Sequence, residues 1–114
     1  PHTLAGDGDP VDVMVLSRFP IINGALIKAR PIGVLITQDE SGDDAKILAI
    51  PITKLDPYYE SILNYTDIPE IELEKIAHFF SSYKQLEKNK HVNVKGWLDR
   101  EKAEEIIMTS VKPY

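Results

Sequence analysis

The feature that most constrains this fold is a pair of apolar runs at residues 32–37 and 46–50, separated by the acidic stretch 39–44. Short runs that are rich in β-branched residues and bounded by turn-forming residues are typical of β-strands. The acidic stretch is hydrophilic and contains Gly42, so we expect it to form the turn between the two strands. The sequence therefore predicts a β-hairpin with an acidic tip.

Three further strands are predicted outside this hairpin. The apolar run 11–16 indicates a buried strand, and a second strand is expected at 25–29. Pro31 is expected to separate that second strand from the run 32–37, because proline is a strong punctuator of local structure. Polar and apolar residues alternate over 91–95, which predicts another strand.

Two helices are predicted in the second half of the chain. The first is expected to begin near Pro69, because acidic residues follow it and favour the start of a helix. Its apolar positions recur at helical spacing and include Leu73, Ile76 and Phe80. Asp99 is expected to cap the last helix, whose inner face carries Ala103, Ile106 and Ile107. Strands that come first and helices that come later indicate an α+β fold rather than a parallel sheet.

The composition excludes several classes of function. A chain of 114 residues is expected to form one domain, and its net charge of −5 argues against a nucleic-acid partner. No apolar run approaches the roughly 20 residues of a membrane span, so no membrane partner is expected. The chain has no cysteine, which excludes disulfides, thiolate catalysis and zinc–cysteine sites and fits a reducing cytoplasm.

Three aspartates near the start of the chain, Asp7, Asp9 and Asp12, fall within one turn and the beginning of the run 11–16. Clustered carboxylates repel one another, and hard divalent cations prefer such oxygen ligands. The calcium loop of EF-hands does not fit, because its sixth position would be Asp12 instead of glycine and its twelfth would be Arg18 instead of glutamate. A metal site and a plain hydrophilic turn both remain open on these residues alone.

The run 7–13 resembles the signature of the soluble, metal-dependent inorganic pyrophosphatases of the bacterial type. Further segments resemble that family in the family's own order, and together they span the chain: residues 30–35, 39–46, 76–84 and 96–97. The resemblance implies a small antiparallel, OB-like β-barrel flanked by two helices. It also implies that residues 1–114 are a single domain forming the C-terminal two-thirds of such an enzyme, with the barrel incomplete at its N-terminus.

The same resemblance implies a hydrolase that converts inorganic pyrophosphate to two orthophosphates with several Mg²⁺ ions, for which Mn²⁺ is a possible substitute. In the family, the residue at Asp9 orients and deprotonates the attacking water. The metal ligands implied by the resemblance are Asp7, Asp12, Asp39 and Asp44. Without it, Asp39 and Asp44 fit the tip of a hairpin equally well.

Lys46, Tyr83 and Lys84 match the family's phosphate ligands. On the residues alone, Lys46 would pair with neighbouring carboxylates or bind phosphate, and Tyr83 would be a core aromatic of the helix. His78 matches a histidine at a subunit contact in hexameric members of the family, and the alternative is an ordinary histidine on a helix face. The resemblance therefore implies a homo-oligomer, with a hexamer favoured.

A non-catalytic OB-type binding module with an acidic metal-binding loop is the alternative function. Such modules for nucleic acid carry a basic groove with aromatic residues, whereas this chain is acidic. The family places further Lys, Arg and Tyr residues in an N-terminal portion that matches nothing here. We therefore expect the 114 residues alone to be impaired in catalysis.

Overall fold

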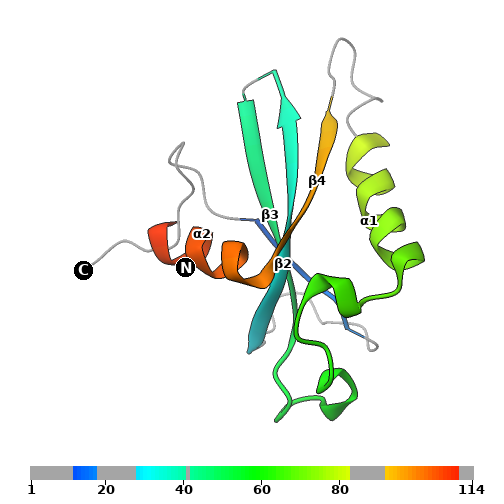
Figure 1. Ribbon diagram of the computed structural model, residues 1–114, viewed down its shortest axis with the longest axis vertical. Coiled ribbons are helices and arrows are strands. Elements are labelled where there is room, and N and C mark those ends of the chain that lie inside the picture. The colour runs from blue at the N-terminus through cyan, green and yellow to red at the C-terminus, as the bar shows by residue number, and fades with distance from the viewer. Residues whose placement is uncertain (1–11, 18–27, 41, 83–91, 111–114) are drawn as a thin grey trace.

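The computed structural model describes residues 12–17, 28–40, 42–82 and 92–110. Its elements are the strands β1 (Asp12–Val15), β2 (Ala29–Asp39), β3 (Gly42–Pro51) and β4 (Asn93–Asp99), the short 3-10 helices η1 (Pro57–Tyr59) and η2 (Tyr65–Asp67), and the α-helices α1 (Glu70–Ser82) and α2 (Arg100–Ser110) (Figure 1). A sheet with two helices confirms the predicted α+β class. Within the described residues, no helix is long and apolar enough to cross a membrane.

The strands form one sheet in the order β1-β3-β2-β4. β2 pairs antiparallel with both β3 and β4, which confirms the predicted hairpin between β2 and β3. β1 pairs parallel with β3, so the sheet is mixed and the expectation of a wholly antiparallel sheet needs correction. The reason is topological: β3 runs opposite to β2, and β1 lies beside β3 with the same direction. In the described part of the chain the sheet is open, with β1 and β4 at its edges.

The hairpin is longer than the sequence predicted. The pairing of β2 with β3 continues as far as the residue pair Asp39 and Gly42, so Asp43 and Asp44 lie within β3. The prediction that the whole stretch 39–44 is a turn was therefore wrong. Strand pairing places the side chains of Asp43 and Asp44 on opposite faces of the sheet, because neighbouring residues of a strand alternate.

Two further strand predictions need correction. Pro31 lies inside β2 and does not separate two strands, because the register shifts between Pro31 and Gly33. Such an irregularity accommodates a residue that has no backbone N–H to donate. β1 was predicted to be buried, but Val13 is 52% exposed, because β1 is an edge strand of the described sheet.

The two helices cover opposite faces of the sheet. Leu48 and Ile50 of β3 belong to a buried cluster that also contains Leu73 of α1. Ile47 belongs to a second cluster with Ala103 of α2, whose predicted inner face is thereby confirmed. Full burial of a Leu or Ile side chain contributes about 1.5–3 kcal/mol, so these clusters fix both helices on the sheet. Because side chains alternate, Lys46 faces the same side as Leu48, namely the α1 side.

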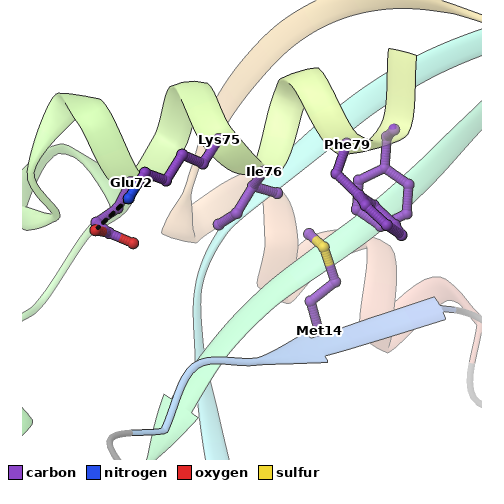
Figure 2. Close-up of a pocket in the computed structure, with 6 residues that line it drawn as sticks. Met14, Glu72, Lys75, Ile76 and Phe79 are labelled. Carbon is purple, nitrogen blue, oxygen red and sulfur yellow. Dashed lines mark ion pairs between the residues drawn. The ribbon is translucent and has the colours of Figure 1, made fainter. Parts of the chain in front are cut away.

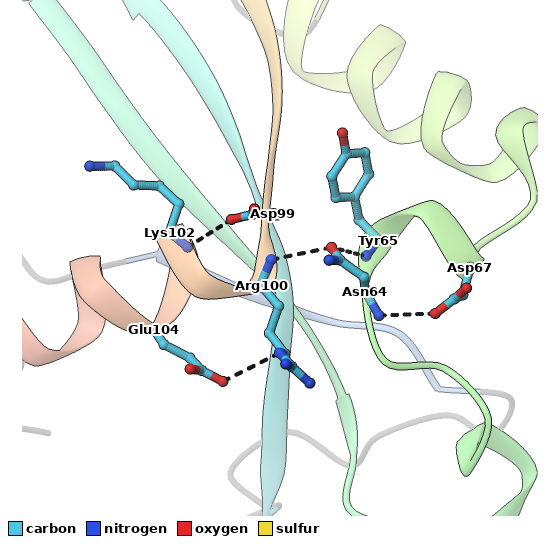
Figure 3. A network of polar contacts seen from close by, with 7 residues as sticks. All are labelled: Asn64, Tyr65, Asp67, Asp99, Arg100, Lys102 and Glu104. Carbon is cyan, nitrogen blue, oxygen red and sulfur yellow. Dashed lines mark hydrogen bonds and ion pairs between the residues drawn. The ribbon is translucent and has the colours of Figure 1, made fainter.

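A polar network joins η2 to the start of α2 (Figure 3). Asn64 Oδ1 accepts hydrogen bonds from the backbone N–H of Tyr65, at 2.9 Å, and from that of Arg100, at 3.2 Å. Asp99 Oδ1 accepts from the backbone N–H of Lys102 at 3.0 Å, which confirms the predicted cap of the last helix. These contacts satisfy donors that a helix start leaves without partners, and they fix the junction between β4 and α2.

Asp67 holds η2 from the other end of the same network. Its Oδ2 accepts from the backbone N–H of Leu63 at 2.9 Å and from that of Asn64 at 3.1 Å. These two donors lower the pKa of the Asp67 carboxyl below its usual value of 3.8, because they stabilise the charged form. The charge of Asp67 therefore supports the local fold.

Candidate active site

Lys46 lies at the centre of a charged cluster on the α1 face of the sheet. Its Nζ lies 3.1 Å from Asp44 Oδ2 and 3.1 Å from Asp12 Oδ2. Asp44 precedes Lys46 by two positions on β3, and Asp12 lies opposite Lys46 in the register of β1 with β3. Strand alternation and register thus bring three side chains from two strands to one point.

Lys46 is buried although it carries a charge, with its side chain only 9% exposed. Burial by itself lowers the pKa of an ammonium group, but the hydrogen bonds and charges of Asp44 and Asp12 outweigh it and raise the pKa above 10.5. Lys46 is therefore protonated at neutral pH. It provides a fixed positive charge beside two carboxylates.

An aromatic ring from α1 also contacts Lys46. The ring centre of Phe80 lies 4.8 Å from Lys46 Nζ, within the range of a cation–π contact. The sequence predicted Phe80 only as a member of the apolar stripe of the helix. Its spacing from Ile76 predicts a shared face, but the sequence does not reveal that α1 passes over Lys46.

Asp39 ends β2 on the same face as this cluster. Thr37 pairs with Asp44, and Asp39 lies two residues further along β2, so their side chains point to the α1 side. Among the residues that the structure describes, no three Asp, Glu or His side chains lie close enough together to hold a metal ion. The carboxylates of Asp12 and Asp44 nevertheless converge on one position, and their oxygens are the ligand type that hard cations prefer.

Asp43 belongs to the opposite face. It forms an ion pair with Lys95 of β4, with an N–O distance of 3.2 Å, and both side chains are about half exposed. The two neighbouring aspartates of β3 therefore pair with lysines on opposite faces of the sheet, Asp44 with Lys46 and Asp43 with Lys95. Only the pair at Lys46 lies on the face that carries Asp12.

The other predicted site residues are placed as follows. Asp7, Asp9, Tyr83 and Lys84 lie outside the described residues. His78 is exposed on α1, and its Nε2 lies 3.5 Å from Ser82 Oγ. The described part of the structure therefore brings Asp12, Asp44 and Lys46 together, places Asp39 on their face, and leaves His78 on the outer surface of α1.

Comparisons with known proteins agree with one family. The family model for inorganic pyrophosphatase matches residues 1–114. The inorganic pyrophosphatase of Caulobacter vibrioides is 51% identical over all 114 residues, and the chain covers 64% of that protein. The chain thus spans about two-thirds of the length of this curated relative.

Solved structures give the same result. The crystal structure of the inorganic phosphatase from Anaplasma phagocytophilum is 56% identical with a TM-score of 0.92, covering 96% of this chain and 64% of that one. The inorganic pyrophosphatase from Helicobacter pylori is 45% identical with a TM-score of 0.92, covering 96% of this chain and 65% of that one. Because the family model matches all 114 residues and the fold is shared with these structures, the chain belongs to the inorganic pyrophosphatase family.

Proposed function

We propose that these residues form part of an enzyme that hydrolyses inorganic pyrophosphate to two orthophosphates. The observation that carries the proposal is the buried Lys46 ammonium between the carboxylates of Asp12 and Asp44, in a chain of the pyrophosphatase family. Pyrophosphate hydrolysis needs both kinds of group, since positive side chains stabilise the anionic substrate and carboxylates hold its counter-ions.

The proposed metal ligands are Asp7, Asp12, Asp39 and Asp44, and the proposed ions are several Mg²⁺, with Mn²⁺ as a substitute. All four proposed ligands are carboxylates, and their oxygen atoms are the ligands that hard cations such as Mg²⁺ prefer. When bound, such ions neutralise substrate oxygens and stabilise the leaving phosphate. Asp12 and Asp44 each place one carboxylate oxygen 3.1 Å from Lys46 Nζ, so both carboxylates lie on the same side of the sheet.

The remaining roles belong to the protein's own side chains. We assign Lys46, Tyr83 and Lys84 to the phosphate oxygens of the substrate. Asp9 would orient the attacking water and accept its proton at the carboxylate. In the structure, the hydrogen bonds and charges of Asp44 and Asp12 raise the pKa of Lys46 and favour its charged form.

We further propose that residues 1–114 form a single domain of a cytoplasmic homo-oligomer, with a hexamer favoured and His78 at a subunit contact. The exposed position of His78 on α1 beside Phe79, which is 58% exposed, supports a contact there. The net charge of −5 supports the expectation that neither nucleic acid nor a membrane surface is a partner.

Release of phosphate from pyrophosphate, measured with and without magnesium, tests the proposal. We expect magnesium-dependent release by a longer chain that carries these residues and matches the relatives in length. The 114 residues alone should act near background, because further phosphate-binding Lys, Arg and Tyr residues belong to the rest of the family's length. Turnover by the 114 residues at the rate of the longer chain would show that the additional segment is dispensable.

The same assay separates the alternative, a non-catalytic OB-type binding module. Such a module would bind pyrophosphate or metal without releasing phosphate in either chain. Magnesium-dependent release by the longer chain excludes that alternative.

A further inference from the structure

We infer that Phe80 is a positioning residue for the proposed reaction, whose ring holds the Lys46 ammonium group beside the carboxylates of Asp12 and Asp44. The catalytic consequence rests on the proposed function. The contact between ring and ammonium can be measured independently of catalysis.

The surroundings of Lys46 favour a strong contact with the ring. Lys46 Nζ lies 4.8 Å from the Phe80 ring centre, and the Lys46 side chain is only 9% exposed. A cation that has lost most of its hydration gains more from an aromatic ring than an exposed one does. The ring therefore adds a third favourable contact to the two carboxylates.

The periodicity of α1 explains why Phe80 reaches this position. Leu73 is buried in the core, and Ile76 packs against the same cluster three residues later. Phe80 follows Ile76 by four residues, so it continues the inner face of the helix by one further turn. The face that packs on apolar residues near the start of α1 thus ends over the charged cluster of the sheet.

Phe80 lies at the edge of a hollow and is not a member of either buried cluster of the described residues. Phe80 borders a hollow of about 310 Å³ between β1 and α1, lined by Met14, Ile76, Phe79, Glu72 and Lys75. Figure 2 shows Met14 pointing from β1 toward Ile76 and Phe79 of α1. Phe79 contacts Phe80 edge to face, with ring centres 5.0 Å apart and an interplanar angle of 87°. Phe80 therefore lines this hollow and also contacts Phe79 and Lys46.

The ammonium group of Lys46 needs a positioning contact, because the lysine side chain is flexible and its charge is compact. The ring restricts the ammonium group to the face where it meets Asp12, Asp44 and, as proposed, the substrate phosphate. Without the ring, the ammonium group of Lys46 should be less well placed to meet the two carboxylates and the substrate phosphate. We expect pyrophosphate affinity to fall by roughly threefold to thirtyfold, the size of effect typical of a cation–π contact.

The contact is tested by NMR of Lys46 in protein with isotope-labelled lysine at one fixed pH, in the 114-residue chain and in the longer chain. Phe80→Leu should remove the ring-current shift of the Lys46 Cε protons, whereas Phe80→Tyr should retain it. Unchanged Lys46 signals in Phe80→Leu would overturn the inference. If Phe80→Leu does not fold, the inference is tested by comparing the native protein with the fluorinated proteins described next.

The positioning role is tested by replacing Phe80 with phenylalanines that carry increasing numbers of ring fluorines. Fluorine weakens the negative face of the ring stepwise and hardly alters its shape. We expect KM for magnesium pyrophosphate in the longer chain to rise with each fluorine and Phe80→Tyr to remain near the native value. A KM that is flat across the series would assign the ring to packing and overturn the role. Absence of turnover in the native longer chain would instead contradict the proposed function, and the NMR result would still decide the contact.

Discussion

Asp12 lies directly opposite Lys46 in the parallel register of β1 with β3, and its Oδ2 lies 3.1 Å from Lys46 Nζ. A shift of this register by one residue would turn Asp12 to the other face of the sheet, because side chains of a strand alternate. The parallel pairing of β1 therefore connects the N-terminal acidic cluster with the acidic hairpin. It brings Asp12 to the same face of the sheet as Asp44.

The first prediction concerns the strength of the two ion pairs of Lys46. A double-mutant cycle with Lys46→Met and Asp44→Asn should give a larger coupling free energy than the cycle with Asp12→Asn, because the Asp44 side chain is 38% exposed and that of Asp12 is 62% exposed. Solvent screening should keep both couplings within about 1 kcal/mol. Urea unfolding in the presence of a metal chelator measures them, and a larger coupling to Asp12 would contradict this account.

The second prediction concerns metal binding. Asp12→Asn and Asp44→Asn should weaken Mg²⁺ binding by about tenfold or more, since even outer-shell partners of a metal typically contribute that much. We expect Asp12→Asn to cost most, because the family resemblance implies that the Asp12 carboxylate would hold more than one of the ions. Asp43→Asn is the matched control on the same strand, since Asp43 faces away and pairs with Lys95. Calorimetry that shows equal loss in all three variants would contradict the assignment.

Much of the fold was predictable from local pattern. The hairpin, the capped last helix and the inner face of α1 all follow from alternation, helical spacing and capping residues, and the structure confirms them. The prediction that Pro31 separates two strands was wrong, because the sequence does not show that a register shift lets a strand continue through a proline. The parallel direction of β1 was missed because strand pairing over a long separation leaves no signal in the strand itself.

The candidate site was predictable to a similar degree. The family resemblance implied a shared site for Asp12, Asp44 and Lys46, whereas their convergence depends on the register of β1 with β3, which no local pattern contains. Phe80 was missed as a site residue because an apolar stripe predicts packing alone. Its contact with Lys46 arises from the position of α1 on the sheet.

The third prediction concerns assembly. His78→Glu should lower the mass measured by light scattering at neutral pH, because it introduces a charge at the proposed subunit contact on α1. Thr109→Glu adds the same charge at an exposed position on α2 and serves as the control. If the His78 variant keeps the native mass, or if both variants lose it, His78 has no particular role in assembly.

The fourth prediction concerns stability in acid. The pKa of Asp67 is lowered in the folded state, so its charge stabilises the fold above its usual pKa of 3.8, and this contribution is lost as the pH falls through the lower, folded-state value. Asp67→Asn keeps an acceptor oxygen for Leu63 and Asn64 but removes the charge. The native chain should therefore be more stable than the variant at about pH 6, and the difference should shrink toward about pH 3. A difference that stays constant over this range would rule out the charge as the cause.

The site itself is tested most directly by comparing two lysines that pair with neighbouring aspartates of β3 on opposite faces of the sheet, Lys46 with Asp44 and Lys95 with Asp43. kcat/KM for magnesium pyrophosphate is measured in the longer chain with Lys46→Met and with Lys95→Met. Lys46→Met should lower kcat/KM by about 100- to 1,000-fold, the usual cost of removing one preorganised charge-stabilising donor, while Lys95→Met should remain close to the native value. Equal values for the two variants, or full activity of Lys46→Met, would contradict the assignment of the active site to the α1 face of the sheet.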